Sequence, residues 1–144
     1  MNGSDRTPMH LWIVGALATL WNAFGAFDYV MTQTRNEKYL AHFTDPQRAY
    51  FDSFPVWMEA AWAFGVWGGL LGALLLLARS RHAVTAFIVS LAGLAVSTIY
   101  QYVLSPPPPD MMTGAMLGLN IAIWVAAVGL LVYAYRMRAR GVLR

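Results

Sequence analysis

Four long stretches of this 144-residue chain carry almost no charged side chain. Residues 7–27, 83–109 and 111–135 contain no Asp, Glu, Lys or Arg, and residues 53–78 contain only Glu59. A helix needs roughly 20 residues to cross a hydrocarbon core of about 30 Å, and each stretch is that long. We therefore predict four transmembrane spans, at about residues 9–31, 55–78, 83–104 and 112–135.

The composition agrees with a chain that lipid solvates. Apolar residues make up 58% of the chain and charged residues 12%, which leaves too few polar side chains to cover a soluble globule of this size. Because backbone polar groups in lipid must bond internally, the spans are expected to be helices. The connection Arg79–His82 is so short that the second and third spans must be antiparallel neighbours. The predicted fold is an all-α membrane protein, a single domain over residues 1–144 that forms an antiparallel four-helix transmembrane bundle.

The basic residues predict the orientation of this bundle. In a four-span arrangement one side holds Arg6, Arg79, Arg81, Arg136, Arg138, Arg140 and Arg144, and the other holds Arg35, Lys38 and Arg48. The positive-inside rule then places both termini and the second connection in the cytoplasm. The net charge of +3 is thus interpreted as a topology signal, and nucleic acid is not an expected partner.

The first connection, residues 32–53, mixes aromatic and charged side chains in a pattern typical of a segment in the membrane interface. Thr44 followed by Gln47 forms a capping box, which predicts one short interfacial helix in this outer loop. A purely structural loop and a moving lid both stay open as interpretations.

The third connection contains Pro106–Pro109. In polyproline II geometry these residues would extend roughly 12 Å, at about 3.1 Å per residue, which is close to the roughly 8–10 Å between packed helices. We interpret them as a stiff bracket between the third and fourth spans. Asp110 follows, and it is expected to cap the N terminus of the fourth span, where the helix dipole favours a negative charge.

Glycine pairs occur at a four-residue spacing in two of the spans. Gly68 and Gly72 lie in the second span, and Gly114 and Gly118 lie in the fourth. Small residues at this spacing let helix backbones approach closely in lipid. Contacts within the monomer are the preferred interpretation, and a homodimer interface is the alternative.

The acidic residues are distributed more unevenly than the basic ones. Six of the seven, namely Asp28, Glu37, Asp45, Asp52, Glu59 and Asp110, fall on the predicted outer half. Asp28 and Glu59 each lie about one turn inside a span, roughly 5 Å below the outer boundary. An ionisable group in a span costs free energy and usually faces a cavity, a partner or a substrate path, so Glu59 is the leading candidate for cation binding or proton exchange. In the structural alternative, both acids bond to Arg35, Lys38 or Arg48 of the overlying loop.

Two asparagines are expected near the bilayer midplane. Asn22 and Asn120, with Ser97 or Thr98, are predicted to form a polar core, either by joining helices or by lining a solute path. Asn22 and Asp28 are about 120° apart around a helix, so we do not expect both to point into one narrow channel. The predicted substrate-binding set comprises Glu59, Asp28, Asn22, Asn120, Tyr29, Trp62 and Gln101.

Motifs for other chemistry are missing from the sequence. The chain has no cysteine, no zinc-ligand spacing, no nucleophile elbow and no phosphate-binding glycine loop. A haem held by His10 and His82 is a minor alternative. We therefore predict no catalytic residue, no metal and no cofactor, and a membrane enzyme is disfavoured.

Three segments carry a resemblance to a known family. They are residues 21–32 (WNAFGAFDYVMT), 54–57 (FPVW) and 62–68 (WAFGVWG). Together they resemble a family of short four-span proteins of Gram-negative bacteria, some of which are called sugar transporters, and the resemblance extends over nearly the whole chain. It implies a bacterial inner-membrane location and no particular binding residues.

Two functional hypotheses follow from these observations. The preferred one is a protein that binds or transports a small polar or cationic solute through an outward-facing acidic pocket. The alternative is a non-transporting accessory or structural subunit of the membrane. In either case the protein is expected to lie in the lipid bilayer. Whether it forms a homodimer is left as an open alternative.

Overall fold

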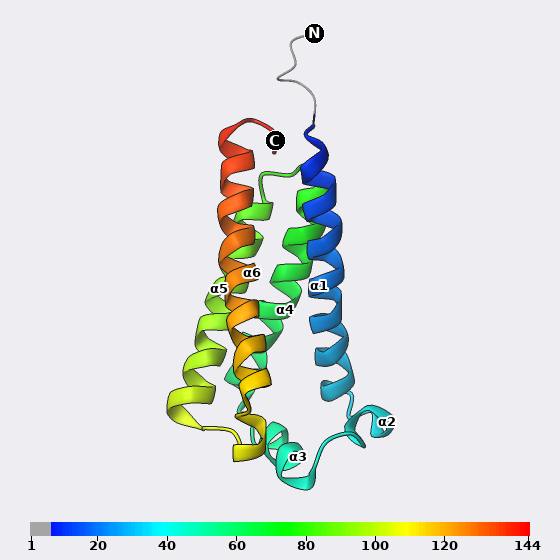
Figure 1. The fold of residues 1–144 in the computed structure, drawn as a ribbon, viewed down its shortest axis with the longest axis vertical. Helices are drawn as coiled ribbons and strands as arrows, with labels where there is room; N and C mark the ends of the chain where they lie inside the picture. Colours follow the sequence, from blue (N-terminus) through cyan, green and yellow to red (C-terminus); the bar gives the residue numbers. More distant parts are fainter. Residues whose placement is uncertain (1–6) are drawn as a thin grey trace.

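The computed structural model describes residues 7–144 and contains only helices and connections in that part of the chain (Figure 1). Its elements are α1 (Met9–Gln33), α2 (Glu37–Leu40), α3 (Asp45–Asp52), α4 (Val56–Leu77), α5 (Ala83–Ile99), the π-helix η2 (Tyr100–Leu104), the 3-10 turn η3 (Pro109–Met111) and α6 (Gly114–Ala139). Four of its helical segments, α1, α4, α5 continued by η2, and α6, are long and apolar enough to cross a membrane. The predicted four-helix membrane fold is confirmed.

The helix ends follow from local sequence. Pro8 and Pro55 stand directly before α1 and α4 with extended backbones, and their fixed φ suits a helix start. Thr113 caps α6, since its side chain accepts a hydrogen bond from the backbone N–H of Met116 at 3.3 Å. The prediction that Asp110 caps this helix is therefore wrong. Asp110 lies in η3, before the cap, and its carboxylate bonds to α3 instead.

The two central helices are α4 and α5, which share the largest helix contact in the bundle. They are joined by the short connection Arg79–His82 and run antiparallel, as predicted. α1 packs on α4, and α6 packs on α5 (Figure 1). α1 and α6 therefore stand on either side of the central pair and have no comparable contact with each other.

Glycines explain how closely α4 approaches α5. A Cβ added at Gly93 would lie 2.5 Å from the carbonyl oxygen of Ala61 and 2.6 Å from the backbone nitrogen of Gly65. A Cβ added at Gly68 would lie 3.1 Å from the backbone nitrogen of Ser90. The predicted use of the second span's glycines inside the monomer is confirmed, whereas Gly118 has no atom of another element within 4 Å of such a Cβ.

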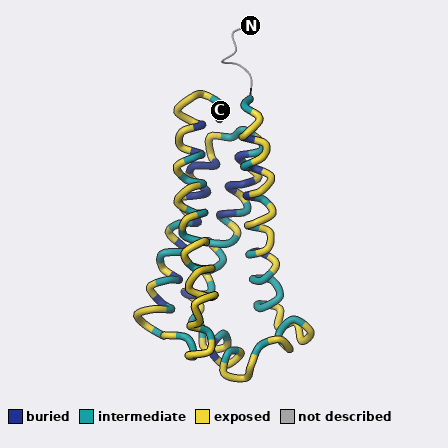
Figure 2. The backbone as a smooth tube through the Cα atoms, viewed as in Figure 1, coloured by how far each residue is buried: buried dark blue, intermediate teal, exposed yellow. Residues whose placement is uncertain are grey.

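One end of the bundle, which we call the arginine end, holds the beginning of α1, the α4–α5 connection and the C terminus (Figure 1). A hydrophobic core fills it, and its largest buried side chains are Leu11, Leu76, Phe87, Met137 and Leu143. Buried residues accordingly concentrate in the upper half of Figure 2. The C-terminal residue closes this end by two backbone hydrogen bonds, from Arg144 N–H to Arg79 O at 2.8 Å and from Arg81 N–H to Arg144 O at 3.0 Å. Arg6, which contributes to the predicted charge asymmetry, lies outside the described residues.

The opposite end, which we call the acidic end, carries the first and third connections (Figure 1). Two short helices, α2 and α3, form the first connection where the sequence predicted one. The capping box predicted at Thr44 and Gln47 starts α3, with both of its hydrogen bonds present. The bundle is therefore tightly packed at the arginine end and covered by short helices at the acidic end.

Candidate ligand cavity

A cavity of about 480 Å³ lies among the four long helices. Three of these helices contribute polar side chains to its wall: Asn22 and Asp28 from α1, Ser90 and Ser97 from α5 with Gln101 from η2, and Asn120 from α6. From α4 come Trp62 and the backbone around Gly65 and Gly69. The volume falls within the range of roughly 300–1,000 Å³ that is usual for small-molecule sites.

Five of the seven predicted site residues line this cavity, namely Asn22, Asp28, Trp62, Gln101 and Asn120. Tyr29 does not line it but packs edge-on against Trp62, with ring centroids 4.9 Å apart. Glu59 is half-buried in the first turn of α4, one turn nearer the acidic end than Trp62. Glu59 is outside the cavity wall, and its carboxylate makes no hydrogen bond or ion pair with the residues that the structure describes.

Asp28 is the one ionisable side chain among the residues that line this cavity. Its carboxylate accepts a short hydrogen bond from the hydroxyl of Tyr39 in α2. Burial raises the pKa of Tyr39 well above its usual value, and the hydrogen bond to Asp28 adds to the rise. The first connection is thus bonded to Asp28, as one alternative expected, but the donor is a tyrosine and not a basic residue.

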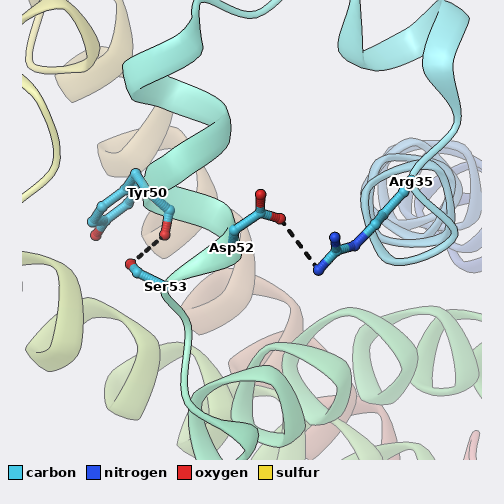
Figure 3. Close-up of polar contacts among 4 residues, drawn as sticks. All are labelled: Arg35, Tyr50, Asp52 and Ser53. Atoms are coloured by element: carbon cyan, nitrogen blue, oxygen red, sulfur yellow. Dashed lines mark hydrogen bonds and ion pairs between the residues drawn. The ribbon is translucent and has the colours of Figure 1, made fainter.

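The basic residues of the outer connection have other partners. Arg35 pairs with Asp52 at 3.4 Å, which links the end of α1 to the end of α3 (Figure 3). Both side chains are more than half exposed, so the pair contributes little free energy. Arg48 donates to the backbone carbonyl of Phe43 at 3.2 Å. None of the ionic links that the structural alternative expected from Arg35, Lys38 or Arg48 to Asp28 or Glu59 is formed among the described residues.

The helix α3 is fastened to the third connection. The hydroxyl of Tyr50, which is buried, donates to the carbonyl of Ser105 at 2.8 Å. Burial raises the pKa of Tyr50 to about 12, and nearby Tyr100 and Tyr102 add to the rise. Gln47 donates from Nε2 to the carboxylate of Asp110 at 2.9 Å.

The two asparagines near mid-span do not bond to each other. Nδ2 of Asn22 donates to Ala18 O of its own helix at 2.8 Å, and Nδ2 of Asn120 donates to the hydroxyl of Tyr102 at 2.8 Å. The carbonyl oxygen of Asn22 points at Gly69, where a Cβ would approach it to 2.2 Å. Gly69 therefore makes room for this oxygen at the cavity wall.

Part of the predicted polar core does join helices, since Asn120 of α6 bonds to Tyr102 of η2 and Thr98 of α5 accepts a bond from α6. Ser90 donates to Gly65 O at 2.6 Å and joins α5 to α4. The indole N–H of Trp124 donates to Thr98 Oγ1 at 3.1 Å and joins α6 to α5. Asn22, Ser97 and Asn120 also line the cavity. Asn22 and Asp28 both lie on the cavity wall, although they are about 120° apart around α1. The cavity is therefore broad, and it is not a narrow channel.

The π-helix η2 was not predicted. A π-turn inserts an extra residue and rotates the following side chains relative to an α-helix, and such turns are frequent at functional sites. Gln101 lies in this turn and reaches the cavity. Tyr100, also in η2, is buried against Phe54 and Trp57 with ring centroids 5.5 and 5.4 Å away.

The floor of the cavity faces the arginine end. Phe87 and Leu130 line the cavity and also belong to, or pack against, the hydrophobic core of that end. Because that core is closely packed, the described residues leave no polar path from the cavity to the arginine end.

Four apolar helices around a cavity with a single ionisable wall residue define an integral, multi-pass membrane protein with a candidate ligand site. Comparison of the chain with protein-family models, curated proteins and solved structures finds no match. Within residues 7–144 no three His, Cys, Asp or Glu side chains are grouped so that they could hold a metal ion.

Proposed function

We propose that this protein binds a small polar or cationic solute in the cavity among its four helices and carries it across the membrane. The observation that supports the proposal most directly is the position of Asp28, a carboxylate on the wall of a cavity that also exposes amide oxygens. A carboxylate inside a span costs a few kcal/mol near the centre and less at the edge, which favours a functional role.

The proposed location is the inner membrane of a bacterium, with both termini in the cytoplasm. In this orientation the arginine end faces the cytoplasm, in agreement with the positive-inside rule. The cavity then faces outward, because its floor is the hydrophobic core of the arginine end. Glu59, one turn nearer the acidic end, is proposed to attract the cation or to exchange a proton before the solute reaches Asp28.

Thermal unfolding of the purified protein in detergent tests solute binding. Tetramethylammonium chloride, choline chloride and glucose serve as probes, because they separate cationic from neutral polar solutes. A probe at about 100 times its Kd stabilises the folded state by about 2.7 kcal/mol. We expect a cation to raise the unfolding temperature of the native protein and to have no such effect on Asp28→Asn.

Asp52→Asn is the matched control, since Asp52 is an exposed carboxylate in α3 away from the cavity. This variant should keep the full response to the cation. The proposed role of Glu59 is tested separately by flux into proteoliposomes, where Glu59→Gln should abolish the pH dependence. Equal stabilisation of the native protein and Asp28→Asn would contradict the proposed site.

The second candidate function is an accessory subunit of a larger membrane complex. It is favoured by α6, in which only Ala134 and Met137 are buried and Gly114 and Gly118 have open space beside them. Gentle detergent purification separates the two functions. A stable stoichiometric partner together with an absence of any solute response would favour the accessory role.

A further inference from the structure

On the side of the bundle between α1 and α6, the two helices make little contact with each other. Near the arginine end the two helices are linked by a hydrogen bond between His10 Nδ1 and the hydroxyl of Tyr133. Farther toward the acidic end α1 packs on α4 and α6 on α5, and the two outer helices have no comparable contact with each other (Figure 1).

Three residues of these two helices line the cavity and are also exposed. Trp21 is 41% exposed, Phe24 73% and Leu119 46%. All three lie within the apolar part of a membrane-spanning helix, so the surface they form would face lipid hydrocarbon. A ligand that crosses this side must therefore be soluble in hydrocarbon.

The cavity wall combines a mainly apolar surface with one negative charge. Trp21, Phe24, Trp62 and Phe87 contribute aromatic surface, and Asp28 contributes the carboxylate. Aromatic faces attract cations, most strongly in the case of Trp. The wall therefore complements an apolar body that carries a positive charge.

The asparagine side chains of the cavity wall also favour a ligand that carries positive charge or donates hydrogen bonds. Asn22 and Asn120 each donate through Nδ2 to a protein oxygen, at 2.8 Å in both cases. Their carbonyl oxygens make no hydrogen bond within residues 7–144, and each can accept one from a ligand. These oxygens lie on the same wall as the carboxylate, so the cavity favours donors and positive charge over anions.

We propose that the ligand of this cavity is a lipophilic cation, an amine or quaternary onium ion with an apolar body, which reaches Asp28 from the bilayer between α1 and α6. This inference rests on the proposed function and names the ligand class for the same site. A second groove of about 530 Å³ between α4 and α5 lacks this complementarity, because His82 is the one ionisable side chain among its lining residues.

Equilibrium dialysis of the full chain in detergent tests the ligand class. The probes are tetraphenylphosphonium, its isosteric anion tetraphenylborate, and tetramethylammonium, which has the charge without the apolar body. Tetraphenylphosphonium should bind saturably, with a Kd about tenfold or more below that of tetramethylammonium, and Asp28→Asn should raise this Kd by about tenfold or more. Tetraphenylborate should show no saturable binding.

Tryptophan fluorescence provides a second measurement that does not depend on the folding of an Asp28 variant. Tetraphenylphosphonium should quench the native protein, and Trp62→Phe should reduce the quenching because Trp62 lines the cavity. Trp12→Phe is the matched control, since Trp12 lies in α1 away from the cavity wall, and it should reduce the quenching less.

The outcomes distinguish this inference from the function on which it rests. Asp28-dependent binding of tetramethylammonium that is as tight as that of tetraphenylphosphonium would overturn the lipophilic ligand and leave cation binding in place. Equal binding of tetraphenylborate would overturn the charge selection. Absence of saturable binding for both cations and for choline would overturn the inference, and absence of glucose binding as well would overturn the proposed function with it.

Discussion

Asp28 shows how a single residue can serve both the scaffold and the site. Its hydrogen bond with Tyr39 holds α2 against the end of α1, while the same carboxylate lies on the cavity wall. An ionised carboxylate can accept several hydrogen bonds, so the bond from Tyr39 leaves capacity for a ligand. The position of Asp28 within its span was predictable from the sequence, but its tyrosine partner was not.

Tyr50 provides a test at the same scale. An unperturbed tyrosine has a pKa near 10, and burial raises the pKa of Tyr50 to about 12 in the folded protein. The folded state thus holds this proton more tightly than the unfolded state does. The raised pKa of Tyr50 contributes fully to the free energy of unfolding below a pH of about 10. This contribution is lost as the pH rises through about 12.

Spectrophotometric titration measures this directly. The absorbance difference between the native protein and Tyr50→Phe should titrate near pH 12 in the folded protein. In denaturant the same absorbance difference should titrate at a pH of about 10. A folded-state difference that titrates at the denatured-state value would contradict the buried position of Tyr50.

Asp110 illustrates why one residue-scale prediction was wrong. Asp is a favourable N-cap, and its place after four prolines made that role reasonable. The carboxylate instead accepts hydrogen bonds from Gln47 at 2.9 Å and Thr44 at 3.3 Å. Those donors come from a distant part of the sequence, and Thr113 is left to cap α6.

At the scale of elements, the stability of the bundle depends mainly on the α4–α5 contact. Gly93 lies where the α5 backbone meets the α4 backbone at Ala61 and Gly65. Without a hydrophobic drive between helices in lipid, such close packing provides much of the attraction. Gly118, like Gly93, is a glycine within a helix, but open space lies beside it.

Gly93→Ala should therefore lower the free energy of unfolding by about 3 kcal/mol, because a methyl group would overlap backbone atoms that cannot rotate away. Gly118→Ala is the matched control and should leave the monomer unchanged or stabilise it by up to about 1 kcal/mol through helix propensity. Reversible unfolding in mixed detergent micelles, followed by circular dichroism, gives both values. Similar losses for the two variants would contradict the close α4–α5 contact.

The π-helix at the end of the third span is an element that sequence patterns did not predict. The sequence of its residues, Tyr100–Leu104, predicts only a continuation of the apolar helix that precedes them. Tyr100, the first residue of this π-helix, packs edge-on against Phe54 and Trp57. That packing is a tertiary contact, so no local period in the sequence reports it.

At the scale of the whole molecule, the two ends of the bundle differ in packing and in charge. The arginine end is closed by the hydrophobic core and by the backbone pairing of Arg144 with the α4–α5 connection. The acidic end carries the first connection with its short helices α2 and α3, at the bottom of Figure 1. This polarity agrees with a cavity that is reached from one side of the membrane and from the lipid.

Reporter fusions test the orientation of the molecule. Alkaline phosphatase, which is active only outside the cytoplasm, should be inactive when fused after Arg144 and active when fused within the first connection, after His42. A fluorescent protein that folds only in the cytoplasm should show the reverse pattern. An active phosphatase at the C terminus would contradict the proposed cytoplasmic location of the arginine end.

The sequence by itself determined the class of the protein, the four spans, the short link that pairs α4 with α5 and the capping box of α3. These features depend on the local free energy of transfer into hydrocarbon and on hydrogen bonds between near neighbours, which composition and spacing report. Only the tertiary structure decided that Asn22, Asp28, Trp62, Gln101 and Asn120 share one cavity wall. It also decided that Glu59 and Tyr29 lie outside this wall and that α1 and α6 make little contact with each other. Those features depend on how each helix is rotated and which neighbour it packs against, and the nearly uniform apolar surface of a membrane helix carries too little periodic signal to fix that rotation.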